Sequence, residues 1–129
     1  MNHRPHLFIA LGLASVLWAQ AQAQTPADLG LQAINDLAQI NGQALACQEL
    51  KAAGRAKSLM IAHAPKTTRF GNAYEEGTKQ SYSLQINSTL ACPDAATLSA
   101  RLDALAQRLQ TSLPASATDA AVNTPAKAQ

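Results

Sequence analysis

Leucines recur along one face of a predicted helix near the C-terminal end of the sequence. They are spaced by three and four positions, which places them on one side of an α-helix: Leu98, Leu102, Leu105 and Leu109. Polar and charged residues fill most of the positions between them. Pro93 suits the first turn of such a helix, and the Asp94 carboxylate suits its positive end. The pattern predicts an amphipathic helix over 93–113.

A second stripe at helical spacing follows the polar connection 66–68. It contains small as well as large residues: Phe70, Ala73, Tyr74, Gly77, Ser81 and Leu84. We therefore predict a helix that begins near Thr68 and continues to about Ile86. From Tyr82 to Leu90, apolar residues alternate with polar ones, which is a strand pattern. A short edge strand paired with another chain is the alternative for that part.

An earlier helix is predicted from apolar residues that recur at intervals of three. These residues are Leu31, Ile34, Leu37 and Ile40. Pro26 precedes them and suits a first helical turn. The pair Asn41-Gly42 interrupts the pattern, and we interpret Gly42 as the end of this helix or as a kink.

The next helix is predicted over 43–64. Pro65 ends it, because proline disfavours helical geometry in the residue before it and has no N–H to donate. One face of this helix carries Cys47, Leu50, Gly54, Ser58 and Ile61. Gly54 and Ser58 lie four positions apart on it, so we expect another backbone to approach closely there.

These elements predict an all-α fold, a small bundle of three to four short helices in one domain over 24–113. Each apolar stripe is one-sided, so the helices must cover one another. The remaining residues, 114–129, are rich in Ala, Thr, Ser and Pro without periodicity, which predicts a disordered tail. Large apolar side chains are few and alanines many, so the predicted core is thin.

The two cysteines, Cys47 and Cys92, are predicted to form a disulfide that closes the bundle. It would tie the start of the second helix to the start of the fourth. On the chain-entropy model a loop of this length contributes about 4 kcal/mol of stability. Two free thiols or a metal pair are the alternatives.

Residues 1–23 have the three parts of a cleavable secretory signal peptide. Arg4 lies in a short polar start, an uncharged apolar run follows over 7–18, and Ala21 and Ala23 supply the small residues of a cleavage site. A membrane anchor is the alternative, but a spanning helix needs about 20 apolar residues and this run is too short. We therefore predict a mature protein that is periplasmic or secreted, and not membrane-spanning after cleavage. Such a compartment also favours the disulfide.

The sequence carries no recognisable signature of catalysis, cofactor binding or metal binding, so we predict no enzyme, no cofactor and no metal site. The formal net charge of +2 gives little attraction toward nucleic acid. His63 is the only histidine of the mature part, and Met60 precedes it by three positions. A copper site would use both residues, but two ligands are an incomplete shell. We prefer His63 as a cation at a negative helix end.

The densest group of distinctive residues joins the second and third helices. It offers cations, hydroxyls and an aromatic ring, and we select it as a candidate partner-binding surface: Lys66, Thr67, Thr68, Arg69 and Tyr74. The alternative is a solvated turn whose aromatic residues enter the core. The favoured function is a non-enzymatic binding or adaptor protein of the cell envelope, whose partner is another envelope protein.

In layout, the chain resembles the small acid-activated chaperones of the bacterial periplasm. Those proteins are also exported helical domains with one disulfide and a helix after each cysteine. The matching features here are Cys47 before 48–64 and Cys92 before 93–113. The resemblance implies a second candidate function, a chaperone that acid activates by protonating paired carboxylates, and it transfers no residue-specific role.

Overall fold

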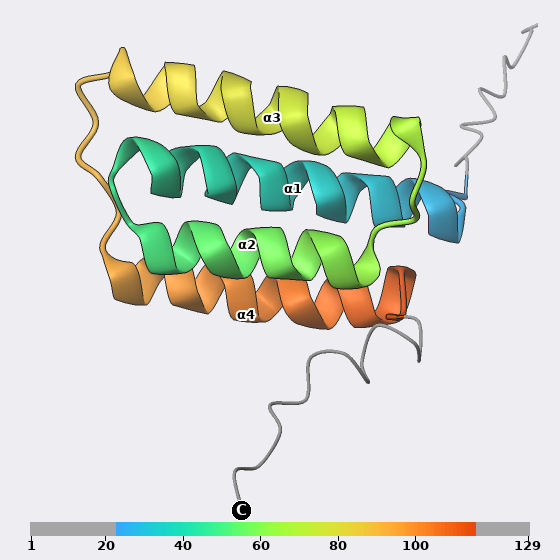
Figure 1. Ribbon diagram of the computed structural model, residues 1–129. Helices are drawn as coiled ribbons and strands as arrows, with labels where there is room; N and C mark the ends of the chain where they lie inside the picture. The colour runs from blue at the N-terminus through green and yellow to red at the C-terminus, as the bar shows by residue number, and fades with distance from the viewer. Residues whose placement is uncertain (1–22, 116–129) are drawn as a thin grey trace, which may run out of the picture.

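The computed structural model describes residues 23–115, which form four α-helices and, within that range, no strand (Figure 1). The helices are α1 (Pro26–Ala46), α2 (Leu50–His63), α3 (Thr68–Ile86) and α4 (Ala95–Ser112). The predicted all-α class is confirmed. Of the predicted tail, 114–129, only residues 114 and 115 are among the described residues. Of the predicted signal peptide, 1–23, only residue 23 is.

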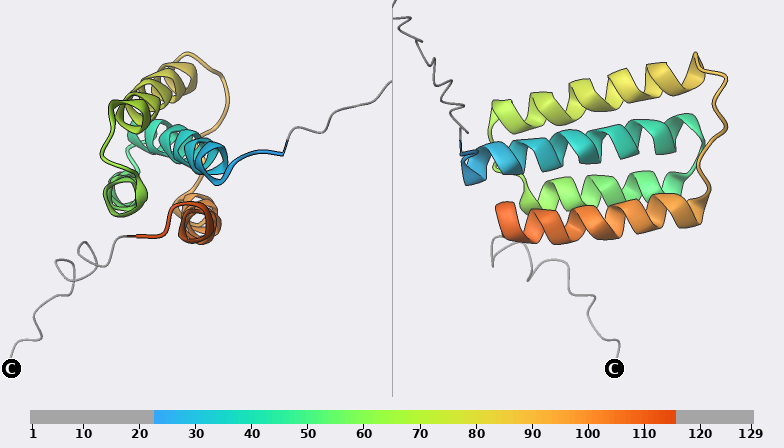
Figure 2. Two further views of the ribbon diagram at one scale, coloured as in Figure 1. Left: turned by 90° about the vertical axis from the view of Figure 1, so that its right-hand side faces the viewer. Right: turned by 180° about the vertical axis from the view of Figure 1, so that it is seen from behind.

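Helix α1 lies at the centre of the bundle, and each of the other three helices packs against it (Figure 2). Helices α1 and α3 run in one direction, and α2 and α4 run in the other (Figure 1). The largest fully buried side chains come from α1 and α4: Ile34, Leu37, Leu98, Leu102 and Leu109. The predicted leucine stripe of α4 therefore faces the core, as expected.

Helix α1 continues through Asn41-Gly42, so the predicted break at Gly42 is wrong. Residues 43–46, which were assigned to the second helix, are the last turn of α1. The chain reverses instead at Gln48, which has φ 60. The Glu49 N–H donates to the Ala44 carbonyl and the Gln48 N–H to that of Leu45, which satisfies carbonyls that a helix end leaves free.

Gly42 is required by the contact between α1 and α3 and not by a turn. A Cβ at position 42 would meet the Thr78 carbonyl oxygen and come within 2.7 Å of the Tyr82 backbone nitrogen. A Cβ at Gly77 would come within 2.8 Å of the Ala38 Cβ. Ala38 and Gly42 on α1 thus meet Gly77 and Ser81 on α3, and small residues bring the two backbones together.

Polar groups complete the contact between α1 and α3. Asn41 Nδ2 donates to Thr78 Oγ1 at 3.1 Å, and Ser81 Oγ donates to the Gln39 carbonyl at 2.7 Å. Phe70 is the only residue of α3 that is buried. Leu84, which was expected in the apolar stripe, is 66% exposed. The end of α3 near Ile86 agrees with the prediction, and the edge-strand alternative is wrong because 82–86 is helical.

The predicted close contact at Gly54 and Ser58 is also wrong. A Cβ at Gly54 would have nothing within 4 Å, and Ser58 Oγ donates to the Gly54 carbonyl of its own helix. The buried face of α2 consists instead of Ala52, Ala53, Ala56 and His63. Leu59 and Met60 are partly buried against the same core, whereas Leu50 and Ile61 lie outside it.

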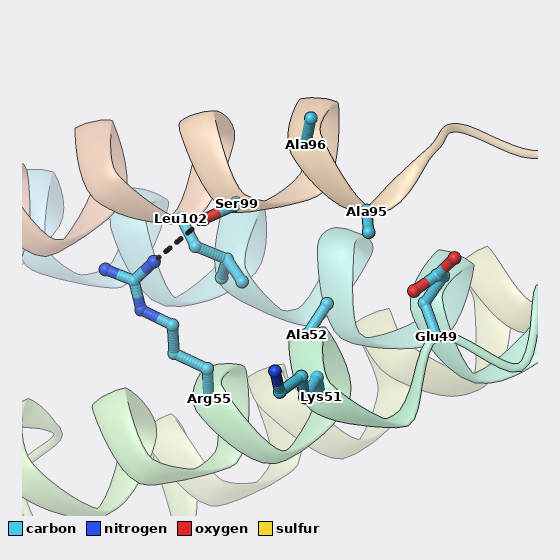
Figure 3. A pocket seen from close by; sticks show the side chains of 8 residues that line it. All are labelled: Glu49, Lys51, Ala52, Arg55, Ala95, Ala96, Ser99 and Leu102. Carbon is cyan, nitrogen blue, oxygen red and sulfur yellow. Dashed lines mark hydrogen bonds between the residues drawn. The ribbon is translucent and has the colours of Figure 1, made fainter.

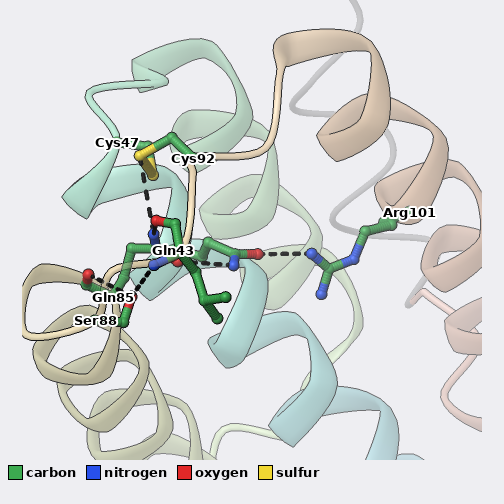
Figure 4. Close-up of a disulfide and its surroundings, with 7 residues drawn as sticks. Gln43, Cys47, Gln85, Ser88, Cys92 and Arg101 are labelled. Atoms are coloured by element: carbon green, nitrogen blue, oxygen red, sulfur yellow. Dashed lines mark hydrogen bonds between the residues drawn. A yellow bond between two sulfur atoms is a disulfide. The ribbon is translucent and has the colours of Figure 1, made fainter.

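The predicted disulfide between Cys47 and Cys92 is confirmed, with Sγ atoms 2.03 Å apart (Figure 4). Cys47 is the C-cap of α1, so the bond links the end of α1, and not the start of α2, to the segment before α4.

Gln43 lies beside the disulfide and connects three helices. Its Nε2 donates to Gln85 Oε1 on α3 at 3.0 Å, and Arg101 on α4 donates to its Oε1 at 2.6 Å.

Candidate functional site

A groove lies between α2 and α3, with α1 as its floor. The left view of Figure 2 shows α2 and α3 on the same side of α1, each packed against it. Two hollows of about 600 and 400 Å³ adjoin along this line and share residues of α1 and α3. The shared residues are Asn41, Leu45, Tyr74 and Glu75. We call the two hollows together the α2/α3 groove.

Large apolar side chains line this groove and remain open to solvent. Leu50 and Ile61 on α2 are 70% and 51% exposed, and Leu45 on the floor is 40% exposed. On α3 the wall is built from Tyr74 and Tyr82, which lie two helical turns apart on one face. A concentration of exposed apolar residues in a concave surface is typical of an interaction site.

Tyr74 is the most deeply placed aromatic residue of the groove. Its ring is half-buried and packs against the core. Its hydroxyl oxygen is buried and has no hydrogen-bond partner. Burial raises the pKa of Tyr74 to about 12, because the phenolate would be poorly solvated there. A buried hydroxyl without a partner costs stability.

Residues of opposite charge line the two walls of the larger hollow. Lys57 projects from α2 and Glu75 from α3, and both line the larger hollow. Both are exposed. Neither takes part in an ion pair within the described part of the chain, where the three ion pairs each join an arginine to an aspartate on another helix: Arg55–Asp103, Arg69–Asp28 and Arg108–Asp36.

The structure divides the partner-binding set that the sequence predicted. Lys66, Thr67, Thr68 and Arg69 are exposed together on the α2–α3 connection and the first turn of α3. Tyr74 lies in the groove instead.

Both cations of this set already have partners within the chain. The Lys66 ammonium donates to the Ile61 carbonyl, and Arg69 pairs with Asp28 at 3.3 Å. Thr67 is the N-cap residue of α3, but its side chain makes no capping hydrogen bond. The connection therefore serves the fold at least in part.

Sequence reasoning missed the groove because it placed the wrong face of α2 in the core. Leu50 and Ile61 were expected to be covered, along with Gly54 and Ser58. The signal that could have revealed the exposed face is the alternative stripe of alanines at 52, 53 and 56, which permits a closer contact with α1.

His63 is the last residue of α2 and is buried. Its Nδ1 lies 2.7 Å from the Leu113 carbonyl oxygen at the end of α4, so Nδ1 carries the hydrogen that is donated. The imidazole thus links the ends of two helices. Among residues 23–115 no three His, Cys, Asp or Glu side chains are grouped as a metal site would require.

A further hollow of about 540 Å³ lies between α2 and α4 (Figure 3). Its charged residues have both signs: Glu49, Lys51 and Arg55. Arg55 bridges to α4, where it contacts Asp103 at 2.5 Å and the Ser99 hydroxyl at 3.5 Å. The hollow between α2 and α4 is a weaker candidate than the α2/α3 groove, because Arg55 is already paired and fewer large apolar residues are exposed there.

No family model, curated protein or solved structure was found to be similar to this chain. Among the helices described here, none is both long enough and apolar enough to cross a membrane.

Proposed function

We propose that the chain is a non-enzymatic binding or adaptor protein of the cell envelope and that it contacts another protein through the α2/α3 groove. The observation that carries this proposal is the exposure of Leu50 and Ile61 in the larger hollow of the groove, which has a volume of about 600 Å³. Covering such residues removes apolar surface from water, which drives most protein association.

The polar groups of the groove fit recognition of a protein surface. Asn41 and Thr78 are hydrogen-bonded to one another. The charged residues that line the groove are Lys57, Glu75 and Lys79, and none of them takes part in an ion pair among residues 23–115. Protein interfaces usually combine apolar contacts with polar and charged groups, as this groove does. The exposed residues 66–69 flank this surface and would widen it.

Export to the envelope is part of the proposal. The N-terminal pattern of a signal peptide and the disulfide both support it, because disulfides persist in oxidising compartments. Mass spectrometry of the product isolated from cells that express the full chain tests this point. We expect a product that begins at Gln24 and has lost two hydrogens to the disulfide. A product that retains residues 1–23 would contradict export by cleavage.

Comparison of matched variants in envelope extracts tests the binding role. After chemical crosslinking, proteins captured by the wild-type chain should be lost from Leu50→Glu and Ile61→Glu. The control is Leu84→Glu, which changes an exposed leucine of α3 that does not line the groove. Capture that is the same for all variants would rule out the groove as the binding surface.

A second candidate function, the acid-activated chaperone, is favoured by the ion pairs. Each of the three contains an aspartate and joins two different helices. Protonation of these aspartates would remove all three links while the arginines keep their charge. The oxidised protein should then lose tertiary structure at about pH 2 to 3 and suppress the aggregation of a client protein. A compact protein without that effect at low pH would eliminate this candidate.

A further inference from the structure

We propose that the occupant of the α2/α3 groove is a second copy of this chain, so that the protein forms a symmetric dimer through this face. The inference rests on the proposed function, because it names the partner of the same groove. It is carried by Lys57 and Glu75, which lie on opposite walls of the larger hollow and take part in no ion pair among residues 23–115. Lys79, the third charged residue of the groove, lines only the smaller hollow.

A two-fold axis along the groove makes this face complementary to itself. In a two-fold interface the same patch is used by both copies, so residue i meets residue j and residue j meets residue i. With the axis parallel to the groove, α2 of one copy lies over α3 of the other. Lys57 of each copy then faces Glu75 of its counterpart, so that this pair of opposite charges forms twice.

The apolar residues match the same arrangement. Leu50 and Ile61 protrude from the α2 wall, whereas Tyr74, Tyr82 and the floor residue Leu45 line the hollow side. Placing α2 of one copy over α3 of the other brings the protruding leucine and isoleucine against the tyrosine wall. The exposed apolar residues of both copies are thereby covered at once. This burial adds apolar contacts to a protein whose own core is thin and rich in alanine.

The symmetry also keeps the α2–α3 connection accessible. Residues 66–69 join α2 to α3 at one end of the bundle (Figure 1). An axis along the groove would leave the connections of both copies at the same end of the dimer. An adaptor of this kind would present the two connections side by side while its grooves are closed.

Charge reversal tests the pairing. The protein purified from cells that express the full chain should sediment at twice the mass of one chain. Lys57→Glu and Glu75→Lys each place like charges together twice, so each should raise the dissociation constant of the dimer about tenfold or more. An equimolar mixture of the two variants restores both opposite pairs, and its dimer should be as stable as that of the wild type.

Matched controls separate this pairing from a general effect of charge. Lys51→Glu and Glu76→Lys make the same changes on the same helices, but neither residue lines the groove. These variants should dimerise as the wild type does, and circular dichroism should show that all variants remain helical. A wild-type chain that stays monomeric, or a mixture of Lys57→Glu and Glu75→Lys that does not recover, would overturn the proposal. Groove-dependent capture of a different protein would in that case leave the proposed function standing.

Discussion

Gly42 lies directly against the backbone of Thr78, so that no side chain fits between α1 and α3 at this point. A methyl group at 42 would meet the Thr78 carbonyl oxygen, which belongs to a helix backbone and cannot move aside. Gly42→Ala should therefore lower the free energy of unfolding by about 3 kcal/mol, measured by urea denaturation.

Gly54 provides the matched control for that substitution. It is also a helical glycine, but a Cβ there has open space. Gly54→Ala should raise the free energy of unfolding by about 1 kcal/mol, because alanine is the better helix former. Equal effects of the two substitutions would show that α1 and α3 do not approach as closely as described.

Gln48 is the only non-glycine residue with positive φ in the described range, and it ends α1 in a left-handed conformation. Glycine adopts this conformation without the steric cost that a Cβ brings. Gln48→Gly should thus raise the thermal midpoint and add about 1 kcal/mol to the free energy of unfolding. The control is Gln110→Gly, which introduces a glycine inside α4 and should lower the free energy of unfolding by a similar amount. A loss of stability in Gln48→Gly would contradict the position of the turn.

Tyr74 buries a hydroxyl that has no partner. Tyr74→Phe removes that group and keeps the ring, so it should stabilise the protein by about 1 kcal/mol at neutral pH. The pKa of Tyr74 is raised to about 12, so the folded state favours the neutral phenol. Ionisation of Tyr74 therefore leaves stability unchanged below the unfolded pKa of about 10 and lowers it as the pH rises from there through the folded value. Tyr74→Phe should therefore weaken the alkaline loss of stability, as followed by circular dichroism from pH 9 upward.

Asp94 caps α4 by accepting a hydrogen bond from the Thr97 N–H at 2.7 Å, which lowers the pKa of the carboxyl. The Thr25 hydroxyl, followed by Arg69, lowers the pKa of Asp28. Because both folded pKa values are depressed, their stabilising contribution is present above the unfolded pKa near 4 and is lost as the pH falls through the folded values. The urea midpoint should hold steady from neutral pH to about pH 5 and then fall.

Asp94→Asn keeps a side chain that can cap a helix but does not titrate. Its urea midpoint should fall less than that of the wild type between neutral pH and about pH 3. The same decline in both proteins would show that the Asp94 cap does not contribute to the acid sensitivity.

The parts of the fold that could be predicted are those set by large apolar residues, by the two cysteines and by a proline. The leucine stripe of α4 is buried as expected, and the two cysteines form the predicted disulfide. Pro65 was also a reliable signal, since α2 ends two residues before it. These features depend on residue types whose physical preferences are strong and local.

The errors arose where small residues determine the packing. A glycine in a helical pattern can mark a helix end, a close contact with another helix or neither. Gly42 is in close contact with α3, whereas the pattern predicted a helix end there. Gly54 was assigned as a contact and has none. The true end of α1 contains neither glycine nor proline, so nothing in its composition indicated the turn at Gln48. The groove could not be predicted either, because it follows from α2 and α3 packing on α1 through small residues, with Leu50 and Ile61 left outside.

Site-specific photocrosslinking in living cells tests the protein-binding role of the α2/α3 groove most directly. A photoreactive amino acid at position 61 lies at the edge of the groove, and the same group at position 84 is a matched exposed control on α3. We predict protein adducts from position 61 and few or none from position 84, with an adduct of twice the chain's mass if the partner is a second copy. No adduct at position 61, or equal adducts at both positions, would contradict the account.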